Sequence, residues 1–219
     1  MNLHSNKTIT VRPFLAPDRA AVRRICYETS FLENPRLYTD DCDVVADVMT
    51  AYSTDREPQA CFVAVCDGQV VGYCVGVKDL NRMNQVFFKK MLWKIIYRAV
   101  KRGTFFKLQT WQFLASTLSC FFKGEFRFPD FSRQYPASLH INIAREFRGH
   151  NIGRRLIEEY VRFLRQHKIS GVLVSVMTES GKNFFVKNGF EVLFETRRSL
   201  FRYRLGRSVP QYLLGRGIA

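Results

Sequence analysis

The sequence predicts an α/β (α+β) fold, in which β-strands and amphipathic helices succeed one another along the chain. The clearest observation is a change of period, because residues 138–143 alternate apolar and polar side chains whereas apolar residues recur at helical spacing from Arg154 onward. A second is the pair Asp67-Gly68 between two β-rich runs, since both residues accept the positive φ of a tight hairpin turn. With 219 residues and 47% hydrophobic content, the chain can bury one sizeable core, and we expect a single domain over residues 1–219.

The remaining elements follow from periodicity and from capping residues. Residues 8–11 form a short first strand, and Pro17 and Asp18 begin the first helix. Asp40 or Asp41 is the expected N-cap of a second helix. The other expected elements are hairpin strands at 60–66 and 69–78, a strand at 138–143, a fifth strand at 170–178, a helix at 181–188, and a closing antiparallel pair at 191–195 and 200–205.

Residues 80–135 carry much of the charge of this basic protein. The formal net charge is +15, and eleven Lys or Arg against two acids between Arg82 and Arg133 give that segment a net +9. Residues 84–103 pair an apolar stripe with a basic one, Gly103 ends that helix, and residues 104–123 form a second, unusually aromatic helix. The segment therefore predicts a basic, aromatic helical hairpin.

Three roles are open for the hairpin at residues 84–123. Its apolar faces can pack on the core, as a lid over a substrate site or as a homodimer contact, with the lysines solvated. A basic amphipathic helix that carries Trp and Phe can instead lie at an anionic membrane surface. Nucleic-acid binding is the least supported role, because charge is its only argument and no known reading module is present.

Cysteine usage and hydropathy suggest the compartment. The six cysteines include no C-x-x-C pair, as expected of reduced packing residues in a cytoplasmic protein. The first ten residues are polar and lack the apolar region of a secretory signal. No run of about 20 apolar residues occurs, which argues against a membrane span.

The segment 148–153 has the composition of an anion-binding loop. Gly149 and Gly153 leave the backbone free to bend, and Asn151 tolerates positive φ better than most other residues. The first turn of the following helix offers unpaired N–H groups and the positive end of the helix dipole. Nearby Arg side chains add formal charge, so a pyrophosphate would fit this loop.

The loop resembles the acyl-CoA signature of the GNAT superfamily of N-acyltransferases, Q/R-x-x-G-x-G/A, with Arg148, Asn151 and Gly153 at its named positions. Asn151 replaces the usual middle glycine. Residues 178–190 resemble the later motif N-x-x-A-x-x-x-Y-x-x-x-G-F of that superfamily. Residues 135–142 are similar to the Y-P-A-H-L-H-I-D stretch of the acetyltransferase-like domain of some O-GlcNAcases, with Ser and Asn in place of the first His and the Asp.

The resemblance implies the GNAT fold, a mixed and mostly antiparallel central sheet flanked by helices. Two parts of the chain lie outside this plan: a helical insertion at 80–135 between strands three and four, where the family commonly has a short turn, and a C-terminal tail at 206–219. The resemblance also implies acetyl-CoA or another acyl-CoA as co-substrate without a metal. The acyl group would pass to a primary amine of an unidentified acceptor by direct attack in a ternary complex. The residues expected to bind the co-substrate are Ile141, Ile143, Arg148, Gly149, His150, Asn151, Ile152, Gly153, Arg154 and Asn183.

Proton transfer is where the sequence departs from the GNAT pattern. Phe185 occupies the position that usually carries the general-acid Tyr. His140 is the candidate general base, because its unperturbed pKa lies near neutrality, and Asn142 on the same strand face could orient a water or the substrate. Further candidates are Tyr73, Tyr135 and Ser175. The altered residues also allow an alternative, a CoA-binding module or sensor with weak or no turnover.

Overall fold

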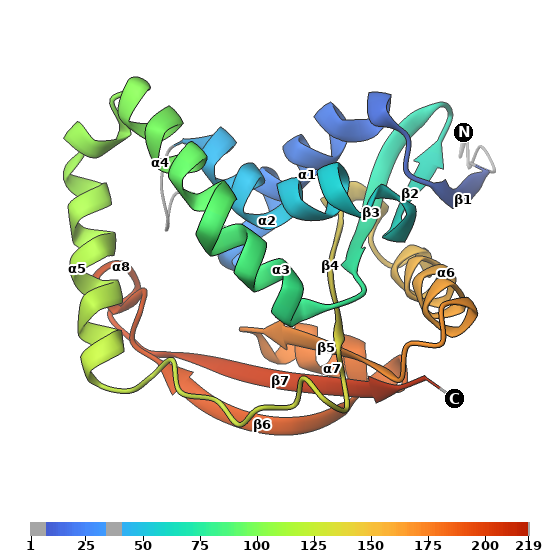
Figure 1. Ribbon diagram of the computed structural model, residues 1–219. Coiled ribbons are helices and arrows are strands. Elements are labelled where there is room, and N and C mark those ends of the chain that lie inside the picture. Colours follow the sequence, from blue (N-terminus) through green and yellow to red (C-terminus); the bar gives the residue numbers. More distant parts are fainter. Residues whose placement is uncertain (1–7, 34–40, 219) are drawn as a thin grey trace, which may run out of the picture.

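One mixed sheet organises the computed structural model, which describes residues 8–33 and 41–218 (Figure 1). Its strand order is β1-β2-β3-β4-β5-β7-β6, and every neighbouring pair is antiparallel except β4 and β5, which are parallel. This confirms the predicted fold class. The strands are β1 (Ile9–Pro13), β2 (Cys61–Cys66), β3 (Gln69–Val77), β4 (Ala137–Ile143), β5 (Gly171–Val176), β6 (Glu191–Arg198) and β7 (Val209–Gly217).

Helices cover both faces of this sheet. On one face α6 buries Leu156 and Leu164 against β1 to β4, and α7 continues that layer over β6 and β7. On the other face α1 buries Val22 and Ile25 against β2 and β3, and α2 packs beside α1. The helices are α1 (Arg19–Glu33), α2 (Cys42–Arg56), α3 (Leu80–Val86), α4 (Leu92–Lys101), α5 (Leu108–Phe122), α6 (Ile152–Gln166), α7 (Glu179–Lys187) and α8 (Arg202–Leu205).

The turn and cap residues adopt the conformations expected of them. Asp67 and Gly68 both have positive φ, 50° and 77°, which confirms the β2–β3 hairpin turn. The Asp41 carboxylate accepts a hydrogen bond from the Val44 amide at 3.1 Å and so caps α2, whereas Asp40 lies outside the described residues.

The expected antiparallel pairing of residues 191–195 with residues 200–205 is wrong. β6 pairs with β7, and not with residues 200–205, which form a buried turn and the short helix α8. Residues 206–219 were expected to form a tail, yet β7 within them lies between β5 and β6. Pro210 and Gly215 weaken the strand pattern there, but Gly215 has a packing reason. A Cβ at this position would come within 2.7 Å of the Tyr135 ring.

The insertion between β3 and β4 forms the predicted helical hairpin, seen at the left of Figure 1. Its first helix, α3, begins at Leu80, whereas the helix was expected from residue 84, because the Asp79 carboxylate caps α3 by accepting from the Arg82 amide at 2.9 Å. A π-helical segment, Phe87–Met91, joins α3 to α4. Gly103, with φ +70°, ends the first arm of the hairpin, which consists of α3 and α4. Among the residues described, no helix combines the length and the apolarity required to cross a bilayer.

Polar contacts fasten both arms of the hairpin to the rest of the fold. The buried Asp41 carboxylate, besides capping α2, accepts from Arg102 Nε at 2.9 Å and from the Thr104 hydroxyl at 2.6 Å. At the other arm, the Ser116 hydroxyl of α5 donates to the Leu200 carbonyl at 2.7 Å. Because both arms are held, the hairpin is a fixed part of the structure.

Candidate functional site

The sheet opens where β4 leaves β5. The two strands pair only at Ala137 with Val172 and at Ser138 with Leu173, whereas β4 remains paired with β3 as far as Ile143. From residue 139 onward, the edge of β4 that faces β5 therefore has no strand partner, and Figure 1 shows β4 crossing from the lower strands to the upper ones.

Backbone alternation shows which groups line this open edge. The Ala144 amide donates to the Val71 carbonyl at the end of β3, at 2.9 Å. Successive residues of a strand direct their backbone groups to opposite sides, so the N–H and C=O groups of Asn142 and His140 also point toward β3. The N–H and C=O groups of Ile141 and Ile143 consequently face the gap, and these are two of the residues predicted to bind the co-substrate.

The loop after β4 brings the start of α6 beside the gap. Gly149 has φ +83° and Asn151 has φ +57°, which confirms the expected left-handed conformation of Asn151. Asn151 is the N-cap residue, but its side chain makes no capping hydrogen bond. The first-turn amides of α6, from Ile152 to Arg154, thus retain the donor capacity of an uncapped helix start.

Gly153 is small for a reason that the sequence did not reveal. A Cβ at this position would lie 2.7 Å from the Phe184 ring of α7 and 3.2 Å from Ile143 Cδ1. Close packing of α6 on α7 and β4 therefore requires this glycine. Gly149 is different, because a Cβ there would meet nothing within 4 Å and only its positive φ favours glycine.

The basic and polar residues of the loop make local contacts. Arg148 Nε donates to the Ile143 carbonyl at 3.3 Å, which ties the loop to the end of β4. Arg154 pairs with Glu158 at 2.7 Å, so part of its charge is neutralised. His150 Nδ1 lies 3.0 Å from the Arg148 carbonyl, an acceptor, so this nitrogen carries the proton. Asn183 is exposed on α7.

The two candidate catalytic residues meet through Tyr73. Asn142 Nδ2 donates to the Tyr73 hydroxyl at 2.9 Å, and that hydroxyl lies 3.1 Å from His140 Nδ1. All three side chains lie on the sheet face that α1 covers, opposite to Ile141 and Ile143. Tyr73 is fully buried, and burial raises the pKa of its hydroxyl, which therefore stays protonated. The register of β3 and β4 places Tyr73 opposite Asn142 and so brings the three side chains together.

The pKa of His140 differs from the sequence expectation. Burial lowers it from 6.5 to about 4, so His140 is neutral at physiological pH. A neutral imidazole can accept a hydrogen bond or a proton, but such a low pKa makes it a weak base. The expectation that the pKa of His140 lies near neutrality is therefore wrong.

Two further candidates lie apart from this network. The Tyr135 ring packs against Gly171 and Gly215, at the start of β5. Ser175, near the other end of β5, accepts a hydrogen bond from the Gln211 amide of β7. Gln211 was not among the predicted site residues, because the strand that carries it was expected to be a tail. Within the described ranges, no group of three or more His, Cys, Asp or Glu could hold a metal ion.

A profile of the acetyltransferase (GNAT) family matches residues 24–190, about three quarters of the chain. The chain belongs to this family. No curated protein matches it significantly. The profile covers the open edge of β4, the loop and α6, but ends before β7.

Solved structures with the same fold include GNAT-family enzymes. The protein called SsHAT is 24% identical, with a TM-score of 0.69 and coverage of 97% of this chain and 99% of that one. YncA of Salmonella typhimurium, a putative acetyltransferase with its cofactor acetyl-CoA, is 14% identical, with a TM-score of 0.58 and coverage of 97% and 95%. A phosphinothricin acetyltransferase of Sinorhizobium meliloti, in complex with acetyl-CoA, is 16% identical, with a TM-score of 0.58 and coverage of 97% and 89%. At such low sequence identity, these likenesses show only that the fold is shared.

Phe185 is the residue at which a general-acid Tyr was expected from the resemblance to the GNAT motif. Phe185 is buried, and its ring centroid lies 5.0 Å from that of Phe190 and 5.2 Å from that of Phe184. The side chain is a core residue and has no proton to donate.

Proposed function

We propose that the protein transfers an acetyl group, or another acyl group, from its CoA thioester to a primary amine. The observation that carries the proposal is the open edge of β4 beside the uncapped start of α6. One short segment, residues 139–154, thus offers backbone groups for an extended arm and amides for an anion. Membership of the acetyltransferase (GNAT) family supports this role.

The first-turn amides of α6 would bind the pyrophosphate, since donors and helix dipole both favour an anion there. The backbone groups of Ile141 and Ile143 would pair with the pantetheine arm along the gap. Acetyl-CoA would supply the activated acyl group as a thioester. An amide of this strand edge would also donate to the thioester carbonyl, and donors that are fixed in a strand stabilise developing negative charge without reorganisation.

The Tyr73–His140–Asn142 network would manage the acceptor amine. His140 is neutral and has one ring nitrogen against Tyr73, which leaves Nε2 as the group available to the acceptor. Asn142 holds the Tyr73 hydroxyl, so its effect on the reaction is indirect. We therefore assign His140 as a catalytic residue that orients the amine and, as a weak base, takes its proton at Nε2, which requires that Nδ1–H donates to the Tyr73 hydroxyl. Tyr73 and Asn142 are positioning residues.

Release of free thiol from acetyl-CoA, followed across a panel of primary amines, tests the reaction. Tyr73→Phe should lower kcat and leave the dissociation constant for CoA unchanged, because the hydroxyl lies away from the proposed CoA edge. His140→Gln should lower kcat further. A kcat equal to that of the wild type in both variants would remove the network from the mechanism.

The proposed CoA site has its own test in the conformation of Asn151. Asn151→Gly keeps the left-handed backbone available, so CoA affinity measured by calorimetry should be equal to or higher than that of the wild type. Asn151→Val places a β-branched residue at φ +57° and should weaken CoA binding at least about tenfold. Equal affinities in the two variants would show that the loop does not bind CoA.

The alternative is a CoA-binding module without turnover. Buried Phe185 removes one acid, but no observation favours the module over the enzyme. CoA binding by calorimetry, with no thiol release on any amine of the panel, would decide for it.

A further inference from the structure

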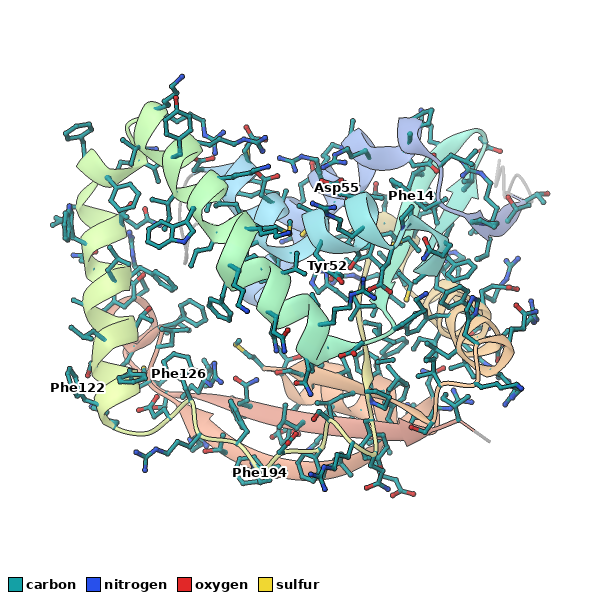
Figure 2. All side chains as sticks on the ribbon, in the orientation of Figure 1. Phe14, Tyr52, Asp55, Phe122, Phe126 and Phe194 are labelled. Atoms are coloured by element: carbon teal, nitrogen blue, oxygen red, sulfur yellow. The ribbon has the colours of Figure 1, made fainter. Side chains whose placement is uncertain are left out.

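The α4–α5 hairpin exposes most of the large apolar side chains found at the surface. Eleven of the fourteen exposed large hydrophobic residues in the described part of the chain lie between Phe88 and Phe122. We call their outward side chains the aromatic face. They include Trp93, Tyr97, Trp111, Leu118, Phe121 and Phe122, and Figure 2 shows Phe122 at the lower end of α5.

Helix α5 is a surface helix without a charged outer side. Its inner side packs Phe113 and Cys120 against the buried residues Leu200 and Phe201, as a surface helix normally does. Its outer side should then be polar or charged, yet residues 108–122 contain no charged residue. Trp111 is also held in place, because its indole N–H donates to the Phe105 carbonyl at 2.9 Å. The outer side is therefore uncharged and mainly apolar, with Trp111, Leu114, Leu118, Phe121 and Phe122 exposed beside Gln112 and Ser119.

The hairpin also exposes six lysines, of which two flank α5 and four lie between residues 89 and 101. In the described ranges, none of them has an acidic partner within 4 Å. They are Lys89, Lys90, Lys94, Lys101, Lys107 and Lys123. The arginines on the inner side differ, because Arg98 pairs with Asp47 and Arg102 with Asp41. The acids of α2 thus neutralise the inner side of the hairpin, and the positive charge remains on its outer side.

We propose that the aromatic face docks on an anionic lipid surface. Helix α5 would lie in the interface, with its apolar side chains below the headgroups and the lysines against lipid phosphates and carboxylates. With 15 residues, α5 is about 22 Å long, shorter than the roughly 30 Å core of a bilayer. The inference stands apart from the proposed acyl transfer, since it uses other residues.

Charge complementarity favours lipid over a second copy of the chain. A homodimer through the aromatic face would bring two sets of unpaired lysines together, on segments that each carry a net +9. An anionic leaflet instead attracts each lysine and also accepts the apolar side chains between them. Both features of the face are then used by one partner.

The chain supplies its own reporter of docking. Trp93 and Trp111 are its two tryptophans, and both lie on the aromatic face. With vesicles of phosphatidylcholine and phosphatidylserine, we expect a blue shift of tryptophan emission and sedimentation of the full-length protein with the lipid. Vesicles of phosphatidylcholine alone should bind much less protein, and added salt should release it from the anionic vesicles.

Matched variants separate the face from general surface effects. Leu118 and Leu15 are 57% and 56% exposed, but only Leu118 belongs to the aromatic face. Leu118→Gln should weaken vesicle binding, and Leu15→Gln should not. Lys94→Gln should lower the partition coefficient about fivefold, the equivalent of about 1 kcal/mol for one charge near the surface. Lys168→Gln, beyond α6, should have no effect.

Thermal unfolding of each variant checks that it remains folded. The proposal is overturned if the protein does not bind anionic vesicles, or if Leu118→Gln and Leu15→Gln bind equally. It is also overturned if light scattering finds a lipid-free dimer that Leu118→Gln dissociates, because a second copy would then cover the face.

Discussion

Protonation of His140 should cost folding free energy in a defined pH window. Its pKa is lowered from 6.5 to about 4 by burial, so the unfolded chain binds a proton in this window that the folded protein does not. Each pKa unit corresponds to about 1.4 kcal/mol, and the contribution is about 3 kcal/mol. It is fully present above about pH 6.5 and is lost as the pH falls through about 4. Neighbouring Tyr73 and Cys26 remain uncharged there, because burial raises the pKa of both.

Urea unfolding of the wild type and of His140→Gln, at pH values from about 4 to about 7, measures this contribution. Gln cannot be protonated but can still hydrogen-bond Tyr73. Carboxylates titrate in both proteins and cancel in the difference. We expect the stability advantage of the wild type to grow by about 3 kcal/mol from the acid to the neutral end. A difference that does not change with pH would refute the burial argument.

Three further substitutions test packing and anchoring through urea unfolding. Gly76→Ala should destabilise the fold by at least about 3 kcal/mol, because its Cβ would lie 2.0 Å from the Tyr160 ring; wild-type stability would contradict this packing. Gly149→Ala should cost only about 1 kcal/mol, since φ is +83° but the space is open, and a loss as large as that of Gly76→Ala would be unexpected. Asp41→Ala should cost about 2 kcal/mol by removing the α2 cap and the partner of Arg102, whereas an unchanged midpoint would mean that the hairpin is anchored elsewhere.

Local patterns were sufficient to predict most of the fold. The hairpin turn at Asp67-Gly68 and the helices of the insertion depend on nearby residues, and both are confirmed. β7 was missed because its pattern contains Pro210 and Gly215, which disfavour a strand locally. Its place is determined by distant partners, β5 and β6, and the fit of Tyr135 over Gly215 is a tertiary contact that no local pattern encodes.

The candidate site shows the same division. The left-handed Asn151 follows from its residue type and its position before a helix, and it was predicted. The bridge from Tyr73 to His140 and Asn142 depends on the register of two strands separated by the long insertion. The lowered pKa of His140 depends on what α1 and β3 bury, so it could not be read from the histidine alone.

The central place of β7 bears on synthesis in the cell. Strands β5 and β6 do not pair with each other, and only residues 209–217 join them. While those residues are still in the ribosomal exit tunnel, both earlier strands have unsatisfied edges. A premature stop codon just before Val209 would therefore release a chain that lacks β7. In that chain β5 and β6 would each have an unpaired edge, which makes the chain prone to aggregation.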